Sequence, residues 1–249
     1  MRLERKGSIG IFYVDTDRSN ATNLDSVAEA NRFMDEAEHD GAIRALVVTS
    51  SNGKMFCPGA DLPTLMSYSR TDVRRFFEST TALFRRKFLY PKPLVYALNG
   101  HAVAGGSLLP LAGDFRLMVD GPFRIGPMEI DVGLAAPAGI VELVRRVLGG
   151  HIADRVMLSG QTYSPQEALT LGMVDEVVEP DSLMDRAIEW AHIFGNKPAE
   201  GYRRLKKYLR SGVAEQSRSL DEIYMDDLVD QWFEAETQQL LAAAAERLS

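Results

Sequence analysis

The stretch KPLVYALNGHAVAGGSLLPLAGDFRL, residues 92–117, decides how this chain is expected to fold. Its first part, PLVYAL (93–98), is an unbroken apolar run of the kind found in strands buried on both faces. Asn99-Gly100 ends that strand, and we expect a short apolar helix from about Gly105 to Ala112. FRLMVD (115–120) then has the composition of a further strand. Strands that alternate with helices in this way predict an α/β layer architecture.

The same alternation continues on both sides of this stretch. Ser164-Pro165-Gln166-Glu167 predicts a helix start, because Ser164 can cap the helix while Glu167 completes a capping box. Strand signals stop after about residue 180, and two or three helices remain. We therefore expect an α/β core over residues 1–195 and a C-terminal helical region over residues 196–249. The further expected strands are 8–14, 43–50, 123–126 and 174–178, and the further expected helices are 24–40, 71–90, 138–149 and 151–160.

Composition and charge exclude several classes of protein. The 249 residues carry a net charge of −7, which argues against a general nucleic-acid binder. A single cysteine, Cys57, cannot form an internal disulfide and fits a reducing compartment. No run approaches the 18 or more apolar residues of a membrane span. The start MRLERKGSIG lacks the pattern of a secretory signal, and the end ERLS is not a peroxisomal address, so we expect a cytoplasmic protein.

Two short runs, FCPGADL (56–62) and GHAVAGGSL (100–108), are rich in small residues and lack a reactive side chain. Turns of Gly and Ala allow a ligand to approach the backbone closely. Two backbone N–H groups aimed at one point form an oxyanion hole, which stabilises negative charge on a substrate oxygen. Ala60 and Gly105 are the candidate donors. Either turn taken alone is more often a packing feature than a catalytic one.

One carboxylate in PFRIGPMEIDVGLAAPAG (122–139) lies in an otherwise apolar run, and it is Glu129. Burial would raise its pKa and make it useful as a base near neutral pH. Asp131 is the nearest rival, because it would face the same way on an extended chain. The alternative is that Glu129 is an edge or loop residue paired with a cation such as Arg124.

Other candidate groups give weaker signals. None of the four histidines shows the pairing of a metal ligand, so no metal site is expected, and His101 is expected to pack or hydrogen-bond near its turn. The run RRLKKYLR (203–210) is either a solvated helix face or a contact for a phosphorylated ligand. The acidic segment 215–248 holds enough apolar residues to dock on the core or on another subunit.

In their order and spacing, these motifs resemble the crotonase family, also called the enoyl-CoA hydratase/isomerase superfamily. FCPGADL is similar to its first oxyanion segment, residues 92–117 to its second, and MEIDVGLAAPAG, VRRVLGG and ALTLGMVDEVV follow in the family's order. The resemblance covers roughly residues 5–240. It implies a crotonase-like spiral of ββα turns with a C-terminal helical trimerisation region, assembled as homotrimers or homohexamers. It also implies that Ala60 and Gly105 donate to the thioester oxygen of an acyl-CoA, and that Glu129 is the acid/base.

The resemblance also bears on the reaction. Hydratases of the family carry a second Glu where this chain has Leu108, and dienoyl-CoA isomerases carry acids in place of Leu108 and Pro137. Δ3,Δ2-enoyl-CoA isomerases keep only the equivalent of Glu129. We therefore expect an enoyl-CoA isomerase of fatty acid β-oxidation, which needs no cofactor because coenzyme A is part of its substrate. A hydratase or another single-acid activity is the alternative, and a non-catalytic acyl-CoA-binding protein is an alternative of another class.

If the substrate is an acyl-CoA, as the resemblance implies, four cationic residues are candidates for binding the phosphates and adenine of CoA. Lys54 lies near the first oxyanion turn, Arg18 in the N-terminal loop, and Lys206 and Lys207 in the tail. Residues 62–89, which follow the first oxyanion turn, are expected to line the acyl tunnel.

Overall fold

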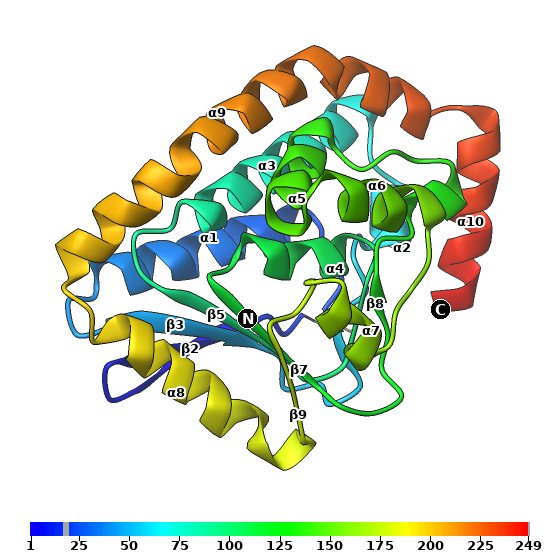
Figure 1. The fold of residues 1–249 in the computed structure, drawn as a ribbon. Coiled ribbons are helices and arrows are strands. Elements are labelled where there is room, and N and C mark those ends of the chain that lie inside the picture. Colours follow the sequence, from blue (N-terminus) through cyan, green and yellow to red (C-terminus); the bar gives the residue numbers. More distant parts are fainter. Residues whose placement is uncertain (17–19, 249) are drawn as a thin grey trace.

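The computed structural model describes residues 1–16 and 20–248, and its main element is a six-stranded sheet (Figure 1). The strand order is β1-β2-β3-β5-β7-β9, in which β1 pairs antiparallel with β2 and every other pair is parallel. The α/β architecture expected from the sequence is confirmed. The strands are β1 (Arg2–Lys6), β2 (Ile9–Tyr13), β3 (Ala45–Thr49), β5 (Leu94–Leu98), β7 (Phe115–Val119) and β9 (Glu176–Val178).

Helices cover both faces of this sheet, which explains why its central strands are apolar throughout. Every residue of β3 and β5 is buried. On one face, alternate residues such as Val47 and Val95 pack against Ala187 of α8 (Leu183–Gly195). On the other face lie α1 (Leu24–His39) and α3 (Arg70–Phe88), which Figure 1 shows above the sheet while α8 lies below it.

A second sheet is small and fully parallel, with the order β4-β6-β8. Its strands are β4 (Met55–Cys57), β6 (His101–Val103) and β8 (Ile125–Gly126). β4 and β6 were not among the strands predicted from the sequence. Each has three residues, which is too short for an alternating pattern to emerge.

Short helices connect the two sheets. The helix expected from Gly105 to Ala112 is divided into an α-helical turn, α4 (Gly105–Leu108), and a 3₁₀ turn, η1 (Leu109–Ala112), because Pro110 cannot donate a backbone hydrogen bond. The capping box of Ser164 and Glu167 is present at the start of α7. The other connecting helices are α2 (Leu62–Leu65), η2 (Glu129–Val132), α5 (Ala138–Leu148), α6 (Gly150–Ser159), α7 (Pro165–Thr170) and η3 (Pro180–Ser182).

The C-terminal region is dominated by one long helix, α9 (Ala199–Trp232), followed by α10 (Ala235–Leu248). α9 runs without a break through Ser211-Gly212. Its second half buries Met225, Leu228 and Trp232, so the apolar residues of this segment dock largely on the core. α9 packs against α3 and α5, and α10 lies against α2 and η2 (Figure 1). Among the described residues, no helix has both the length and the apolar character to cross a membrane.

Candidate active site

The small sheet brings the three candidate site residues together at one edge. Ala60 follows β4 by three residues, Gly105 follows β6 by two, and Glu129 follows β8 by three. Since the three strands are parallel neighbours, their carboxyl ends open at the same edge. This is the edge at which ligands bind in open parallel sheets.

The two glycine-rich turns are in contact with each other. Gly59 has φ +94°, and a Cβ built on it would lie 3.0 Å from the amide nitrogen of Gly105. Thr22 holds the first turn from its other side, since its N–H donates to Gly59 O at 2.8 Å and its carbonyl accepts from Asp61 N at 2.8 Å. Neither of these hydrogen bonds involves the N–H of Ala60. The N–H groups of Ala60 and Gly105 have no acceptor among the described residues.

The second turn has an unusual backbone. Ala104 has φ +47°, a region that L-residues rarely occupy and that costs of order 1–3 kcal/mol. The conformation reverses the chain so that α4 starts directly beside the first turn. Gly106 is required here for space, because a Cβ on it would lie 2.1 Å from the carbonyl oxygen of Cys57. Gly105 has no such close contact, so its missing side chain leaves open space in front of its amide.

Glu129 faces this open space. Its Oε1 is 4.0 Å from the position that a Cβ on Gly105 would take, and its Oε2 is buried without a hydrogen-bond partner in residues 1–16 and 20–248. Burial raises the pKa of Glu129 to about 7, although hydrogen bonds from the N–H groups of Glu129 and Met128 act in the opposite direction. The alternative pairing with Arg124 is not formed. That guanidinium instead donates to the carbonyl and hydroxyl of Thr162.

Asp131 does not share the orientation of Glu129, contrary to our expectation for an extended chain. Residues 129–132 form the 3₁₀ turn η2, in which side chains two positions apart point in different directions. The Asp131 side chain is exposed, and its Oδ1 lies 2.6 Å from where a Cβ on Gly160 would be. Asp131 is therefore a residue of the pocket's rim.

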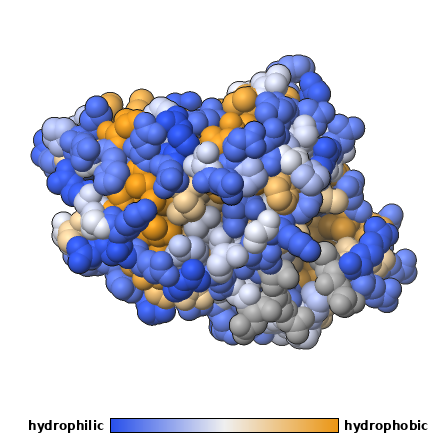
Figure 2. All heavy atoms as spheres, turned by 90° about the horizontal axis from the view of Figure 1, so that it is seen from below, coloured by the Kyte–Doolittle hydropathy of each residue, from blue (hydrophilic) through white to orange (hydrophobic). Residues whose placement is uncertain are grey.

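The two turns and Glu129 open into a pocket of about 430 Å³. Its walls are mostly apolar, and Leu108 within them is buried. Among the described residues, the carboxylates that line it are Glu129 and Asp131. The segment 62–89 supplies much of the wall, as expected. Figure 2 shows the molecule from below, with apolar patches among polar side chains and a hollow in one of them. The wall residues from this segment are Leu62, Phe76, Phe77, Thr80, Leu83, Phe84 and Lys87.

Part of the pocket comes from α10, which our sequence analysis did not assign to the site. Leu240, Leu241 and Arg247 line the pocket together with Trp232 at the end of α9. The only sequence signal was the apolar character of the tail, which is equally compatible with a subunit interface. The docking of α10 on η2 is what brings these residues to the site.

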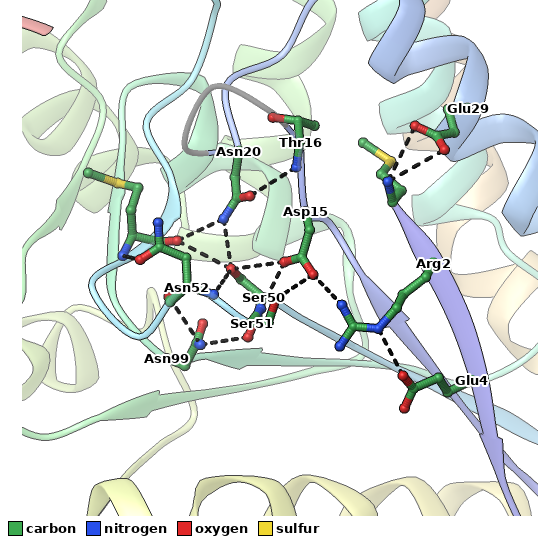
Figure 3. Close-up of polar contacts among 12 residues, drawn as sticks. Arg2, Glu4, Asp15, Thr16, Asn20, Glu29, Ser50, Ser51, Asn52 and Asn99 are labelled. Carbon is green, nitrogen blue, oxygen red and sulfur yellow. Dashed lines mark hydrogen bonds and ion pairs between the residues drawn. The ribbon is translucent and has the colours of Figure 1, made fainter. Parts of the chain in front are cut away.

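A polar network holds the segment that leads into β4 (Figure 3). The amide of Asn20 donates to Ser50 Oγ at 2.7 Å and to the Met55 carbonyl at 2.8 Å. Asp15 accepts from Ser51 N at 2.8 Å, and Asn99, after β5, donates to Ser50 O at 2.7 Å. These bonds tie the carboxyl ends of β2, β3 and β5 together and so fix the start of the first turn.

The cationic candidates for CoA fall into different environments. Arg18 lies outside the described residues. Lys54 is exposed and precedes Met55, which lines the pocket. Lys207 is exposed on α9, and nothing in the chain pairs with it among the described residues. Assigning Lys206 to the phosphates was wrong, because its ammonium is buried and bound to Asp114 at 2.6 Å.

The basic run 203–210 therefore combines two roles. Arg203 and Arg204 form an exposed ion cluster with Glu200, as a solvated helix face would. Lys206 and Arg210 point inward and pair with Asp114, which anchors α9 on the core.

The remaining candidate groups have structural explanations. His101 Nδ1 accepts from the backbone N–H of Arg124 at 3.0 Å, as expected for a residue that hydrogen-bonds near its turn. Burial raises the pKa of Cys57 to about 11, so its thiol is unreactive. No group of three potential metal ligands occurs in the part of the chain that the structure describes.

Comparison with known proteins agrees with this geometry. A family model described as enoyl-CoA hydratase/isomerase matches residues 5–247. The short-chain-enoyl-CoA hydratase of Clostridium acetobutylicum is 30% identical over 79% of this chain and 76% of its own length. The mitochondrial enoyl-CoA delta isomerase 1 of Mus musculus is 32% identical over 75% of this chain and 65% of its own length. The crystal structure of human mitochondrial delta3-delta2-enoyl-CoA isomerase has the same fold, with a TM-score of 0.94, 24% identity, and coverage of 99% of this chain and 97% of that one.

Proposed function

The chain belongs to the enoyl-CoA hydratase/isomerase family, and on that premise we propose that it moves the double bond of a 3-enoyl-CoA to give the 2-trans-enoyl-CoA. One observation carries this proposal. The Glu129 carboxyl, whose Oε2 has no hydrogen-bond partner in the described part of the chain, faces Gly105 in a pocket where Leu108 stands in place of a second acid. The fatty acyl thioester and the pathway, fatty acid β-oxidation, are part of the proposal.

In the first step, Glu129 removes a proton from C2 of the substrate. This proton is acidified by the thioester carbonyl on one side and by the C3=C4 double bond on the other. The electron pair of the broken C–H bond delocalises into a dienolate, whose oxygen becomes negative. The N–H groups of Ala60 and Gly105, which have no acceptor among the described residues, are suited to stabilise that oxygen.

In the second step, the same carboxylic acid returns the proton at C4. The electron pair moves from the dienolate to the new C4–H bond, and the remaining double bond lies between C2 and C3. Glu129 ends as a carboxylate, so atoms and charge balance over the cycle. A pKa near 7 suits both steps, because the group must accept a proton and then release it.

The apolar wall supports isomerisation over hydration. Hydration requires a water held and activated beside C3, and a second carboxylate is the group that could do this. Leu108 is buried and cannot hydrogen-bond a water. A pocket that excludes water also protects the dienolate from being protonated by solvent.

The proposal is tested by adding 3-enoyl-CoA or 2-enoyl-CoA to the purified protein and following ultraviolet absorbance. A rise in the absorbance of the conjugated thioester from 3-enoyl-CoA, with 2-enoyl-CoA left intact, is the expected result. Consumption of 2-enoyl-CoA with formation of the 3-hydroxy product would identify a hydratase instead, which is the activity named for the Clostridium relative. Binding of both without turnover would identify a non-catalytic acyl-CoA-binding protein.

The assembly and the CoA contacts also belong to this proposal. Exposed apolar residues on α9, among them Leu205, Tyr208 and Leu209, offer a surface for a homotrimer or homohexamer. Lys54 stays a candidate for the CoA phosphates, since it is exposed next to the first turn.

A further inference from the structure

A buried lysine in the wall of the pocket has no counter-ion in the part of the chain that the structure describes. Lys87, near the end of α3, is 4% exposed and lines the pocket. Among the described residues, no hydrogen bond or ion pair reaches its ammonium. It belongs to the same helical stripe as Thr80, Leu83 and Phe84, because positions three, four and seven apart share one face of a helix.

The second buried lysine, Lys206, serves as a comparison because it has a counter-ion. Lys206 is 5% exposed, and its ammonium is bound to the Asp114 carboxylate at 2.6 Å and to the Lys92 carbonyl at 3.3 Å. Burial of an uncompensated charge is costly, and folded proteins normally supply a partner. The fold does so for Lys206, whereas for Lys87 no such partner lies within residues 1–16 and 20–248, and the side chain lines a pocket in which a ligand could supply one.

The neighbours of Lys87 do not compensate its charge. The titratable group close to it is the thiol of Cys57, whose raised pKa of about 11 keeps it neutral at physiological pH. Burial lowers the pKa of Lys87 to about 8, so the side chain is still largely protonated near pH 7. Phe12, Val27 and Phe84 also line the pocket, and the Thr80 hydroxyl on the same stripe of α3 carries no charge that could pair with the ammonium. An apolar acyl chain that filled the pocket would leave the ammonium buried and unpaired.

We infer that the pocket selects an acyl-CoA whose acyl group ends in a carboxylate, and that Lys87 binds that carboxylate as its ion-pair partner. A carboxylate provides the negative charge and the hydrogen-bond acceptors that the wall lacks around this ammonium. This inference rests on the proposed function only in so far as the pocket holds the acyl group of a CoA thioester. It makes Lys87 a residue that determines specificity, with no part in proton transfer.

The test measures binding, so that it does not depend on turnover. Saturated ω-carboxyacyl-CoAs of increasing length, from succinyl-CoA to suberoyl-CoA, are titrated into the protein by calorimetry beside the methyl-ended acyl-CoA of each length. The wild type is expected to prefer the carboxylate at one or more lengths by at least about tenfold, which is the lower end for a buried charge pair. The length of greatest preference reports the distance between Lys87 and the thioester site.

Two variants distinguish the ion pair from general effects on the pocket. Lys87→Met keeps most of the side-chain volume but removes the charge, and it is expected to abolish or reverse the preference. Its melting temperature without ligand should equal or exceed that of the wild type, because an unpaired buried charge is removed. Thr80→Val removes a pocket-lining hydroxyl on the same stripe of α3, which has no partner within the described ranges, and should leave the preference unchanged.

The inference is overturned if the wild type prefers methyl-ended chains at every length, or if Lys87→Met retains the preference for carboxylates. A failure of the isomerase assay has a different signature. In that case both classes of 3-enoyl-CoA stay unconverted, while the binding preference and its dependence on Lys87 persist.

Discussion

The Glu129 carboxyl and the Gly105 backbone face each other at the N-terminal end of α4. Oε1 of Glu129 lies 4.0 Å from the position that a side chain on Gly105 would fill. Glycine at position 105 thus keeps open the space between a candidate base and a candidate oxyanion donor. This arrangement depends on the parallel pairing of β6 with β8, since each residue follows one of these strands.

Replacing the candidate base should abolish isomerisation. We expect Glu129→Gln to lower kcat by about 10²–10⁴-fold, the usual contribution of a positioned acid or base, while acyl-CoA binding changes little. Asp131→Asn is the matched control, because it neutralises the other carboxylate of the pocket. Stopped-flow absorbance on 3-enoyl-CoA measures both. Loss of activity in the Asp131 variant with retention in the Glu129 variant would reassign the base.

The activity should rise with pH. Glu129 must be ionised to accept the C2 proton, and its pKa is raised to about 7 by burial. We therefore expect kcat/KM to increase roughly tenfold per pH unit below pH 7 and to level off above it. The profile of Asp131→Asn should have the same midpoint. A profile that is flat between pH 5 and pH 8 would contradict Glu129 as the base.

The same carboxyl should make the protein less stable as pH rises. In the unfolded chain a Glu titrates near 4.5, whereas in the folded protein Glu129 titrates near 7. Between these values the folded state binds more protons, so the free energy of unfolding falls with increasing pH. Glu129→Gln has no carboxyl at this position, so this loss of stability with rising pH should be absent from the variant. Chemical denaturation at pH 4 and pH 8 should show the variant gaining stability over the wild type at the higher pH, and an equal difference at both would count against the burial of this group.

An acid introduced at position 108 should enable the protein to hydrate 2-enoyl-CoA. Leu108→Glu adds a carboxyl where family hydratases carry their second Glu, and we expect 2-enoyl-CoA to be slowly converted to the 3-hydroxy product. The variant should lose about 2 kcal/mol of stability, because a polar group replaces a buried leucine. Leu108→Gln, which cannot act as an acid or a base, is the control. Chromatography of the products measures hydration. Hydration by both variants, or by neither, would refute this role for position 108.

A methyl group at position 59, in the first turn, should obstruct the Gly105 amide of the second turn. Gly59→Ala would put a Cβ 3.0 Å from the Gly105 nitrogen, and we expect kcat to fall by about 10²-fold, as for the loss of an oxyanion donor. Gly7→Ala is the control for backbone strain, because Gly7 also has a positive φ, at +64°, but has open space around it. Both should lose about 1–2 kcal/mol of stability. Comparable activity in the two variants would argue against a role for the Gly105 amide.

The sequence by itself determined the order of the elements and predicted the candidate site residues. The buried strands at 45–49 and 94–98 were predictable because apolar runs are local patterns, and the helix over residues 70–88 because its apolar stripe has the helical period. Ala60, Gly105 and Glu129 were predicted as candidates from two small-residue turns, a carboxylate in an apolar run, and the order and spacing of these motifs. The apolar run around Glu129 suggested a raised pKa, but Met128 and Ile130 are themselves exposed, so the burial that raises it comes from the tertiary packing.

Only the tertiary structure decided what each charged side chain meets. Lys87 and Lys206 both lie in basic stretches of helices, yet one is buried in the pocket wall and the other against Asp114. A carboxylate 92 positions away in the chain distinguishes them, and no local pattern records it. The burial of a charge depends on which elements pack over it, and the pairing of β4, β6 and β8 likewise joins segments far apart in the sequence. For this reason candidate residues could be predicted singly from the sequence, whereas their partners required the fold.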